Sequence, residues 1–243
     1  KRVEVEPETV LKAIAEAIKG LGAAVKDGWI SSLQDPVTKY LPEMEGSAYE
    51  GVTVEQIATM TSGVRWNESY TDPNSDVAKM GAIVAAQGED AIVTQLKALP
   101  REAPAGEKFV YKTGETNLIG VLVSEATGKN LAEYLSEKVW SPFGMEQDAT
   151  WLLGLSGHEI AGCCVQAATR DMARFGHLML SEGSWNGDQV MADQAYYQAM
   201  IDLETDDAYL QSMRDDYIFG MQTFFPSLAQ MYAPQEGLPR NTP

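Results

Sequence analysis

The sequence holds very little cysteine and histidine. Its only cysteines are Cys163 and Cys164, and its only histidines are His158 and His177. Adjacent cysteines are poorly placed to bridge one another, so we expect two small, buried, apolar side chains without a disulfide. His158-Glu159 begins like a zinc-protease motif, but no second histidine follows four residues on. With so few ligands and none at zinc spacing, the sequence predicts no metal site.

Basic residues are scarce as well. Eighteen Lys and Arg stand against 35 Asp and Glu, which leaves a formal net charge of −17. Such a field repels phosphate backbones and excludes general nucleic-acid binding. No glycine-rich phosphate cradle is present either, so we expect no nucleotide and no other cofactor. Acidic residues gather at 202–216, and binding of a basic partner protein to that face is one alternative function.

Long apolar runs are missing. None approaches the roughly 20 residues of a membrane-spanning helix, and the first residues, Lys-Arg-Val-Glu-Val-Glu, contain no apolar signal core. We therefore expect a soluble protein without a signal peptide and without a membrane partner. The low cysteine content fits the cytoplasm and the periplasm equally well.

What is present predicts one helix-rich domain over residues 1–243. Apolar residues make up 44% of the chain, enough for a core without staples. Gly28 is placed to end the first helix in a left-handed conformation, and Thr53 with Gln56 forms a capping-box pattern. Apolar spacing predicts helices at 7–28, 53–63, 77–86, 89–99, 116–126, 131–139 and 168–182. Strands are expected only at 2–6 and 217–225, with a short extended piece at 109–111, so the class is α+β.

One short segment has the composition of a catalytic site. Tyr111-Lys112-Thr113-Gly114 follows the short extended piece. A lysine beside a tyrosine favours the ionised phenol and lowers its pKa, which makes Tyr111 a candidate general base and Lys112 its electrostatic helper. Ordinary packing of a half-buried tyrosine is the alternative.

Several phrases, taken together and in order, resemble the penicillin-recognising serine hydrolases, and more closely the β-lactamase-like esterases and 6-aminohexanoate-dimer hydrolases. The similarity covers about residues 23–187, with phrases at 27–42, 51–64, 104–122, 140–145 and 168–176. The resemblance implies a β-lactamase-like helical lobe at about 29–200. It also implies a reduced antiparallel sheet built from the terminal segments, 1–28 and 201–243.

The resemblance further implies acyl transfer from small carboxylic esters or amides, without a cofactor. In this family a serine attacks the carbonyl, a lysine three residues later activates it, and a tyrosine relays protons. The tyrosine carries over to Tyr111. Thr113 stands where many relatives have asparagine, and Trp66 is placed to line the acyl pocket, so both are candidate substrate-binding residues.

The nucleophile departs from the family pattern, because no S-x-x-K occurs in the chain. An ungapped count places Leu11 and Ile14 at the serine and lysine positions. A two-residue shift brings in Thr9 and Lys12 as a T-x-x-K, although the threonine methyl group restricts its side chain. The alternative is a catalytically inactive or redesigned scaffold, which the idealised composition of residues 8–19 favours.

The reduced sheet also bears on assembly. The family continues with further strands where this chain has a proline-rich stretch at 226–243. An incomplete sheet would present an exposed edge, and exposed edges recruit partners. A homodimer is therefore expected.

Overall fold

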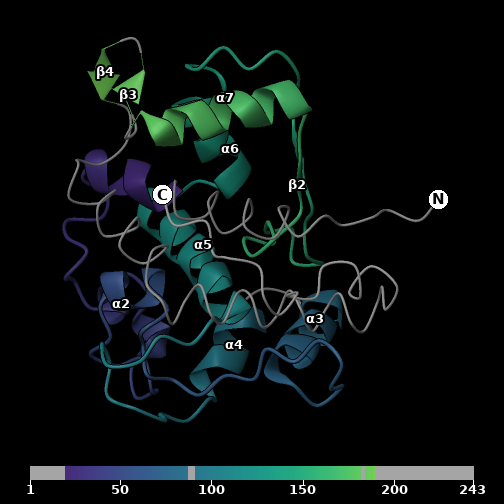
Figure 1. Ribbon diagram of the computed structural model, residues 1–243. Coiled ribbons are helices and arrows are strands. Elements are labelled where there is room, and N and C mark those ends of the chain that lie inside the picture. Colours follow the sequence, from purple (N-terminus) through teal and green to yellow (C-terminus); the bar gives the residue numbers. More distant parts are fainter. Residues whose placement is uncertain (1–19, 87–90, 182–183, 186, 190–243) are drawn as a thin grey trace, which may run out of the picture. The chain divides into compact units, whose positions relative to one another are not determined.

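Helices predominate in the computed structural model, which describes residues 20–86, 91–181, 184–185 and 187–189. Residues 20–26 are helical. A π-helical turn, η3 (Ser136–Trp140), directly follows helix α6 (Leu131–Leu135). Two 3-10 turns, η1 (Val37–Lys39) and η2 (Pro42–Met44), precede the second helix. The remaining helices, labelled in Figure 1, are α2 (Val54–Ala58), α3 (Asp76–Ala86), α4 (Ala91–Lys97), α5 (Thr113–Thr127), α6 (Leu131–Leu135) and α7 (Thr169–Leu180).

The strands are short and antiparallel. β1 (Thr150–Trp151) pairs with β2 (Val165–Gln166), and β3 (Ser184–Trp185) pairs with β4 (Asp188–Gln189). The α+β class is therefore confirmed. The predicted strands at 2–6 and 217–225, most of the terminal segments expected to build the reduced sheet, and the acidic stretch at 202–216 lie outside the described residues. No helix in the described ranges is both long and apolar enough to cross a bilayer.

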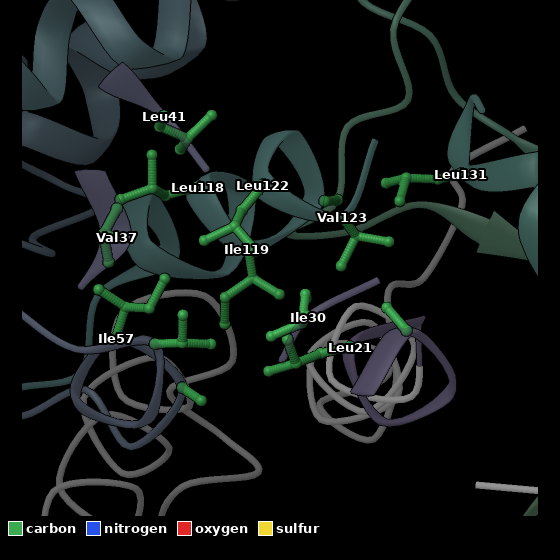
Figure 2. Close-up of a cluster of buried hydrophobic side chains, with 14 of the residues drawn as sticks. Leu21, Ile30, Val37, Leu41, Ile57, Leu118, Ile119, Leu122, Val123 and Leu131 are labelled. Carbon is green, nitrogen blue, oxygen red and sulfur yellow. The ribbon is translucent and has the colours of Figure 1, made fainter. Parts of the chain in front are cut away.

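Helix α5 lies at the centre of the helical packing. It contacts α2, α3, α4 and α6. Four of its apolar side chains are completely or almost completely buried: Leu118, Ile119, Leu122 and Val123. Figure 2 shows them together with Leu21, Ile30, Val37, Leu41, Ile57 and Leu131. Burial of apolar surface is the main driving force of folding. The buried side chains of α5 therefore hold the helix in place, and with it the position of its first turn.

The two local signals predicted at helix ends are confirmed. The Gln56 backbone N–H donates to the Thr53 hydroxyl at 3.2 Å, and the Thr53 N–H donates to the Gln56 side chain at 3.0 Å. Gly28 has a φ of 79°, and its N–H donates to the Val25 carbonyl at 3.1 Å. Both signals involve near neighbours in the chain, which is why the sequence was sufficient to predict them.

The expectation for the cysteines is wrong. Cys163 and Cys164 form a disulfide with each other, and both residues are half-buried. The reason is local backbone conformation. The Cys163 N–H closes a turn onto the Ile160 carbonyl at 3.2 Å, and Cys164 has a φ of 80°. Residues other than glycine rarely adopt this left-handed region, so the composition of the segment did not predict it.

Candidate active site

Tyr111, Lys112 and Thr113 lie at the point where an extended segment enters α5. The segment joins neither sheet, but the Val110 N–H donates to the Met60 carbonyl at 3.1 Å. Lys112 is the residue directly before α5, and its backbone is extended. Its carbonyl accepts a hydrogen bond from the Glu115 N–H at 3.0 Å, in the first turn of the helix. Successive side chains of an extended segment point to opposite sides, so Lys112 and its two neighbours face different surroundings.

The side chain of Lys112 points into the protein. Its ammonium lies 3.3 Å from the Ser62 hydroxyl and 3.6 Å from the Glu115 carboxylate. The Ser62 hydroxyl donates to the same Glu115 oxygen, and the Tyr49 hydroxyl donates to it at 3.2 Å. Lys112, Glu115, Ser62 and Tyr49 are each fully buried. We call these four residues the buried ionic cluster.

Burial dominates the electrostatics of this cluster. It raises the pKa of Glu115 to about 7, against the opposing effects of Lys112, Ser62 and Tyr49. It also lowers the pKa of Lys112, again opposed by the pair interaction. Within the described part of the chain, the second carboxylate oxygen of Glu115 is buried and has no hydrogen-bond partner. Removal of either ion would therefore leave the other buried without compensation.

On the outer side of the α5 first turn, Glu68 gathers four donors. Its carboxylate accepts from the Thr113 N–H at 3.0 Å and from the Tyr70 hydroxyl at 2.6 Å. It also accepts from the Thr113 hydroxyl and from the indole N–H of Trp66. We call this arrangement the Glu68 hub. It brings together the two predicted substrate-binding residues, Trp66 and Thr113, through a residue that the sequence analysis missed.

The members of the Glu68 hub differ in exposure. Trp66 is buried with only 7% of its surface exposed, whereas Tyr70 is 61% exposed. The Trp66 ring packs closely against α5, because a β-carbon at Gly114 would lie 2.8 Å from it. Trp66 is therefore packed against α5, whereas Tyr70 lies at the protein surface. Helix N-termini favour nearby carboxylates, and Glu68 is an acidic residue in a polar loop. This is the sequence signal that could have pointed to Glu68 as a partner of the first turn of α5.

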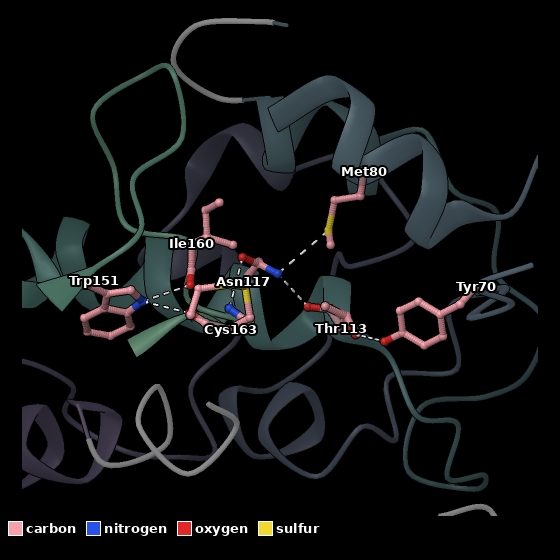
Figure 3. Close-up of a disulfide and its surroundings, with 9 residues drawn as sticks. Tyr70, Met80, Thr113, Asn117, Trp151, Ile160 and Cys163 are labelled. Atoms are coloured by element: carbon pink, nitrogen blue, oxygen red, sulfur yellow. Dashed lines mark hydrogen bonds between the residues drawn. A yellow bond between two sulfur atoms is a disulfide. The ribbon is translucent and has the colours of Figure 1, made fainter. Parts of the chain in front are cut away.

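A third segment, the loop at 160–164, lies against α5 (Figure 3). The Gly162 N–H donates to the Asn117 side-chain oxygen at 3.2 Å. The amide nitrogen of Asn117 in turn donates to the Thr113 carbonyl at 2.9 Å. The indole N–H of Trp151 bridges the Ile160 and Cys163 carbonyls, each at 3.0 Å. Thr113 is thus held from one side by Glu68 and from the other through Asn117.

The structure brings four of the six predicted site residues into this region. Tyr111 is 8% exposed and directly precedes Lys112 and Thr113. The candidate nucleophile Thr9 and its partner Lys12 lie outside the described residues. Within the described ranges, no group of three or more His, Cys, Asp or Glu residues is arranged to hold a metal ion.

Comparison with known proteins confirms the family. The model of the beta-lactamase family matches residues 20–233, so this chain belongs to that family. The chain is 32% identical over 190 residues to the 6-aminohexanoate-dimer hydrolase of Paenarthrobacter ureafaciens, an alignment that covers 75% of this chain and 48% of the relative. The resemblance to β-lactamase-like hydrolases is therefore confirmed.

Solved structures confirm the fold. A structure named as a 6-aminohexanoate-dimer hydrolase from Bacillus anthracis superimposes with a TM-score of 0.67 at 26% identity, covering 77% of this chain and 50% of that one. A beta-lactamase/D-alanine carboxypeptidase from Yersinia pestis gives 0.55 at 20% identity, covering 77% and 56%, and shows the fold alone. The chain spans about half the length of these relatives.

Proposed function

We propose that this chain hydrolyses small carboxylic esters or amides by acyl transfer, without a cofactor. The observation that carries the proposal is the position of Tyr111. It is buried directly before the α5 first turn, in a chain of the beta-lactamase family, and Thr113 of that turn is bound by Glu68. The relative in Paenarthrobacter ureafaciens, which is named as a hydrolase of the 6-aminohexanoate dimer, supports a small-molecule hydrolase.

The roles follow from the chemistry of the groups. A side-chain hydroxyl forms a bond to the carbonyl carbon while the bond to the leaving alcohol or amine breaks, and water then releases the acid. Tyr111 accepts the proton of the attacking hydroxyl and returns it to the leaving group. The ammonium of Lys112 is directed at Ser62 and Glu115, so in this proposal Lys112 holds the first turn of α5 in place beside Tyr111. Thr9 and Lys12 are the proposed nucleophile and its activator.

Trp66, Thr113 and Tyr70 supply the substrate surface in this proposal. The buried ring of Trp66 forms an apolar wall for the acyl group. Thr113 and the exposed Tyr70 offer hydroxyl groups at the outer edge, both already oriented by Glu68. Such a combination of an apolar wall with few oriented polar groups is typical of small-molecule sites.

A catalytically inactive scaffold is the second candidate. The absence of an S-x-x-K motif from the sequence favours it, because removal of the nucleophile leaves little of the rate enhancement. The hydrolase and the inactive scaffold would have the same fold and the same surface around Thr113. They differ only in whether a covalent acyl-enzyme forms. A homodimer remains part of the proposal, and sedimentation velocity at several protein concentrations tests it.

The deciding experiment combines a covalent probe with turnover. The chain is incubated with a fluorophosphonate, its intact mass is measured, and hydrolysis of p-nitrophenyl acetate is followed. We expect one adduct per chain, mapped by peptide analysis, and turnover that Tyr111→Phe abolishes. Tyr40→Phe is the matched control, because it removes a hydroxyl that is bound to Asp35 in another part of the fold. No adduct and no turnover from a folded chain would establish the scaffold instead.

A further inference from the structure

We propose that the Cys163–Cys164 disulfide is a redox modification site that a dithiol reductant opens, and that its state controls how the 160–164 loop lies on α5. The disulfide is half-buried, so a small reductant reaches it. An effect of reduction on ester turnover would rest on the proposed function. The movement of the 160–164 loop does not, because it depends only on the hydrogen bonds between this loop, Trp151 and Asn117.

The disulfide lies within a closely hydrogen-bonded turn. The Cys163 carbonyl accepts the indole N–H of Trp151 at 3.0 Å. The Cys164 carbonyl accepts the Leu152 N–H at 3.3 Å, and the Cys163 N–H closes the turn onto Ile160. These bonds tie the backbone on both sides of the disulfide to the segment around Trp151, as Figure 3 shows for the Trp151 bonds. A change at the disulfide is therefore transmitted to the backbone of the loop.

The next residue back, Gly162, carries that change to the candidate active site. Its N–H donates to Asn117, which donates in turn to the Thr113 carbonyl. The approach is so close that a β-carbon at Gly162 would lie 2.9 Å from the Thr113 methyl group and would clash with the Asn117 amide. Because there is no spare space, a displacement of the loop changes the surroundings of Thr113 directly.

The reaction is thiol–disulfide exchange. One thiolate of the reductant attacks a cysteine sulfur, the disulfide breaks, and a mixed disulfide forms. The second thiol of the reductant then closes its own disulfide. Cys163 and Cys164 gain two electrons and two protons as thiols, and the reductant is oxidised by the same two electrons. Once the small ring is open, nothing covalent holds Cys164 at its φ of 80°, a region that residues with a β-carbon disfavour.

The test compares the oxidised and reduced forms of the full chain. Dithiothreitol treatment followed by iodoacetamide counts the accessible thiols by mass. Hydrogen exchange then measures protection of the Gly162 amide, which is bound to Asn117 in the oxidised form. We expect two alkyl groups after reduction and roughly tenfold faster exchange at Gly162. Fluorescence of Trp151 should change in parallel, and Trp151→Phe should remove that change.

The variant Cys163→Ser/Cys164→Ser serves as the matched control, because it cannot form the disulfide. It should exchange like the reduced wild type and should not respond to dithiothreitol. Unchanged exchange at Gly162 in a fully alkylated wild type would overturn the proposal, and so would cysteines that stay unmodified under native conditions. A lack of ester turnover in both redox states would refute the proposed function only, since the exchange measurement decides this inference independently.

Discussion

The ammonium of Lys112 lies 3.6 Å from the carboxylate of Glu115, and neither side chain is exposed to solvent. The pair spans the first turn of α5, one residue after Tyr111. Ser62 and Tyr49, which are more than 50 residues away from Glu115 in the sequence, both donate hydrogen bonds to one of its carboxylate oxygens. A pair of buried ions costs much desolvation energy, so its integrity depends on both members being present.

Replacement of Lys112 should therefore destabilise the fold strongly. Lys112→Met leaves the Glu115 carboxylate buried without a positive partner, and we expect the free energy of unfolding at pH 8 to fall by about 3–5 kcal/mol. Urea denaturation measures this. The double variant Lys112→Met/Glu115→Gln should recover much of the loss. The control is Lys108→Met, an exposed partner of Glu102 whose removal should cost at most about 1 kcal/mol. Equal losses in Lys112→Met and the control would contradict the prediction.

Glu115 should also give stability a specific pH dependence. Its ordinary pKa of 4.5 is raised to about 7 by burial, so between these values the folded state binds a proton that the unfolded chain has released. The resulting contribution to stability is complete below pH 4.5 and is lost as the pH rises through about 7. We expect the wild type to lose stability across this window relative to Glu115→Gln. Parallel curves for the two proteins, measured by urea denaturation at each pH, would refute the assignment.

The Glu68 hub should orient the outer part of the candidate site. Glu68→Ala removes the acceptor of Trp66, Tyr70 and Thr113, and we expect a loss of about 2 kcal/mol of stability. Increased quenching of tryptophan fluorescence by acrylamide would report the loosened Trp66. If the proposed function is right, kcat/KM for p-nitrophenyl acetate should fall as well. Glu43→Ala, at an exposed carboxylate, is the control and should change neither quantity.

Two glycines in helices should respond oppositely to the same substitution. In Gly114→Ala the new methyl group would lie 2.8 Å from both Leu96 and Trp66, so we expect a destabilisation of about 1–3 kcal/mol. Gly81 lies on the exposed side of α3, and no atom of the described residues lies within 4 Å of the equivalent position. Gly81→Ala should therefore stabilise the protein by roughly 0.5–1 kcal/mol through helix propensity. Urea denaturation of both variants gives the comparison, and a gain in Gly114→Ala would show that this packing is not tight.

The candidate site was only partly predictable from the sequence. Tyr111 and Thr113 were proposed because a short motif carries them, and Trp66 because it lies on a loop of the helical lobe. Glu68 was missed because it reaches Thr113 across a separation of 45 residues. The roles of Ser62 and Tyr49 were missed for the same reason, since their contacts with Glu115 cross 53 and 66 residues.

The sequence by itself determined the class of fold, the positions of most of the described helices, the caps at Gly28 and Thr53, and the family. These features depend on apolar spacing, on near-neighbour hydrogen bonds and on ordered motifs. Only the tertiary structure decided that the charge of Lys112 is directed at Glu115, that Glu68 collects the donors around Thr113, and that Cys163 bonds to Cys164. The first two depend on which distant segments α5 brings together. The third depends on a left-handed backbone conformation at Cys164 that residue type does not favour.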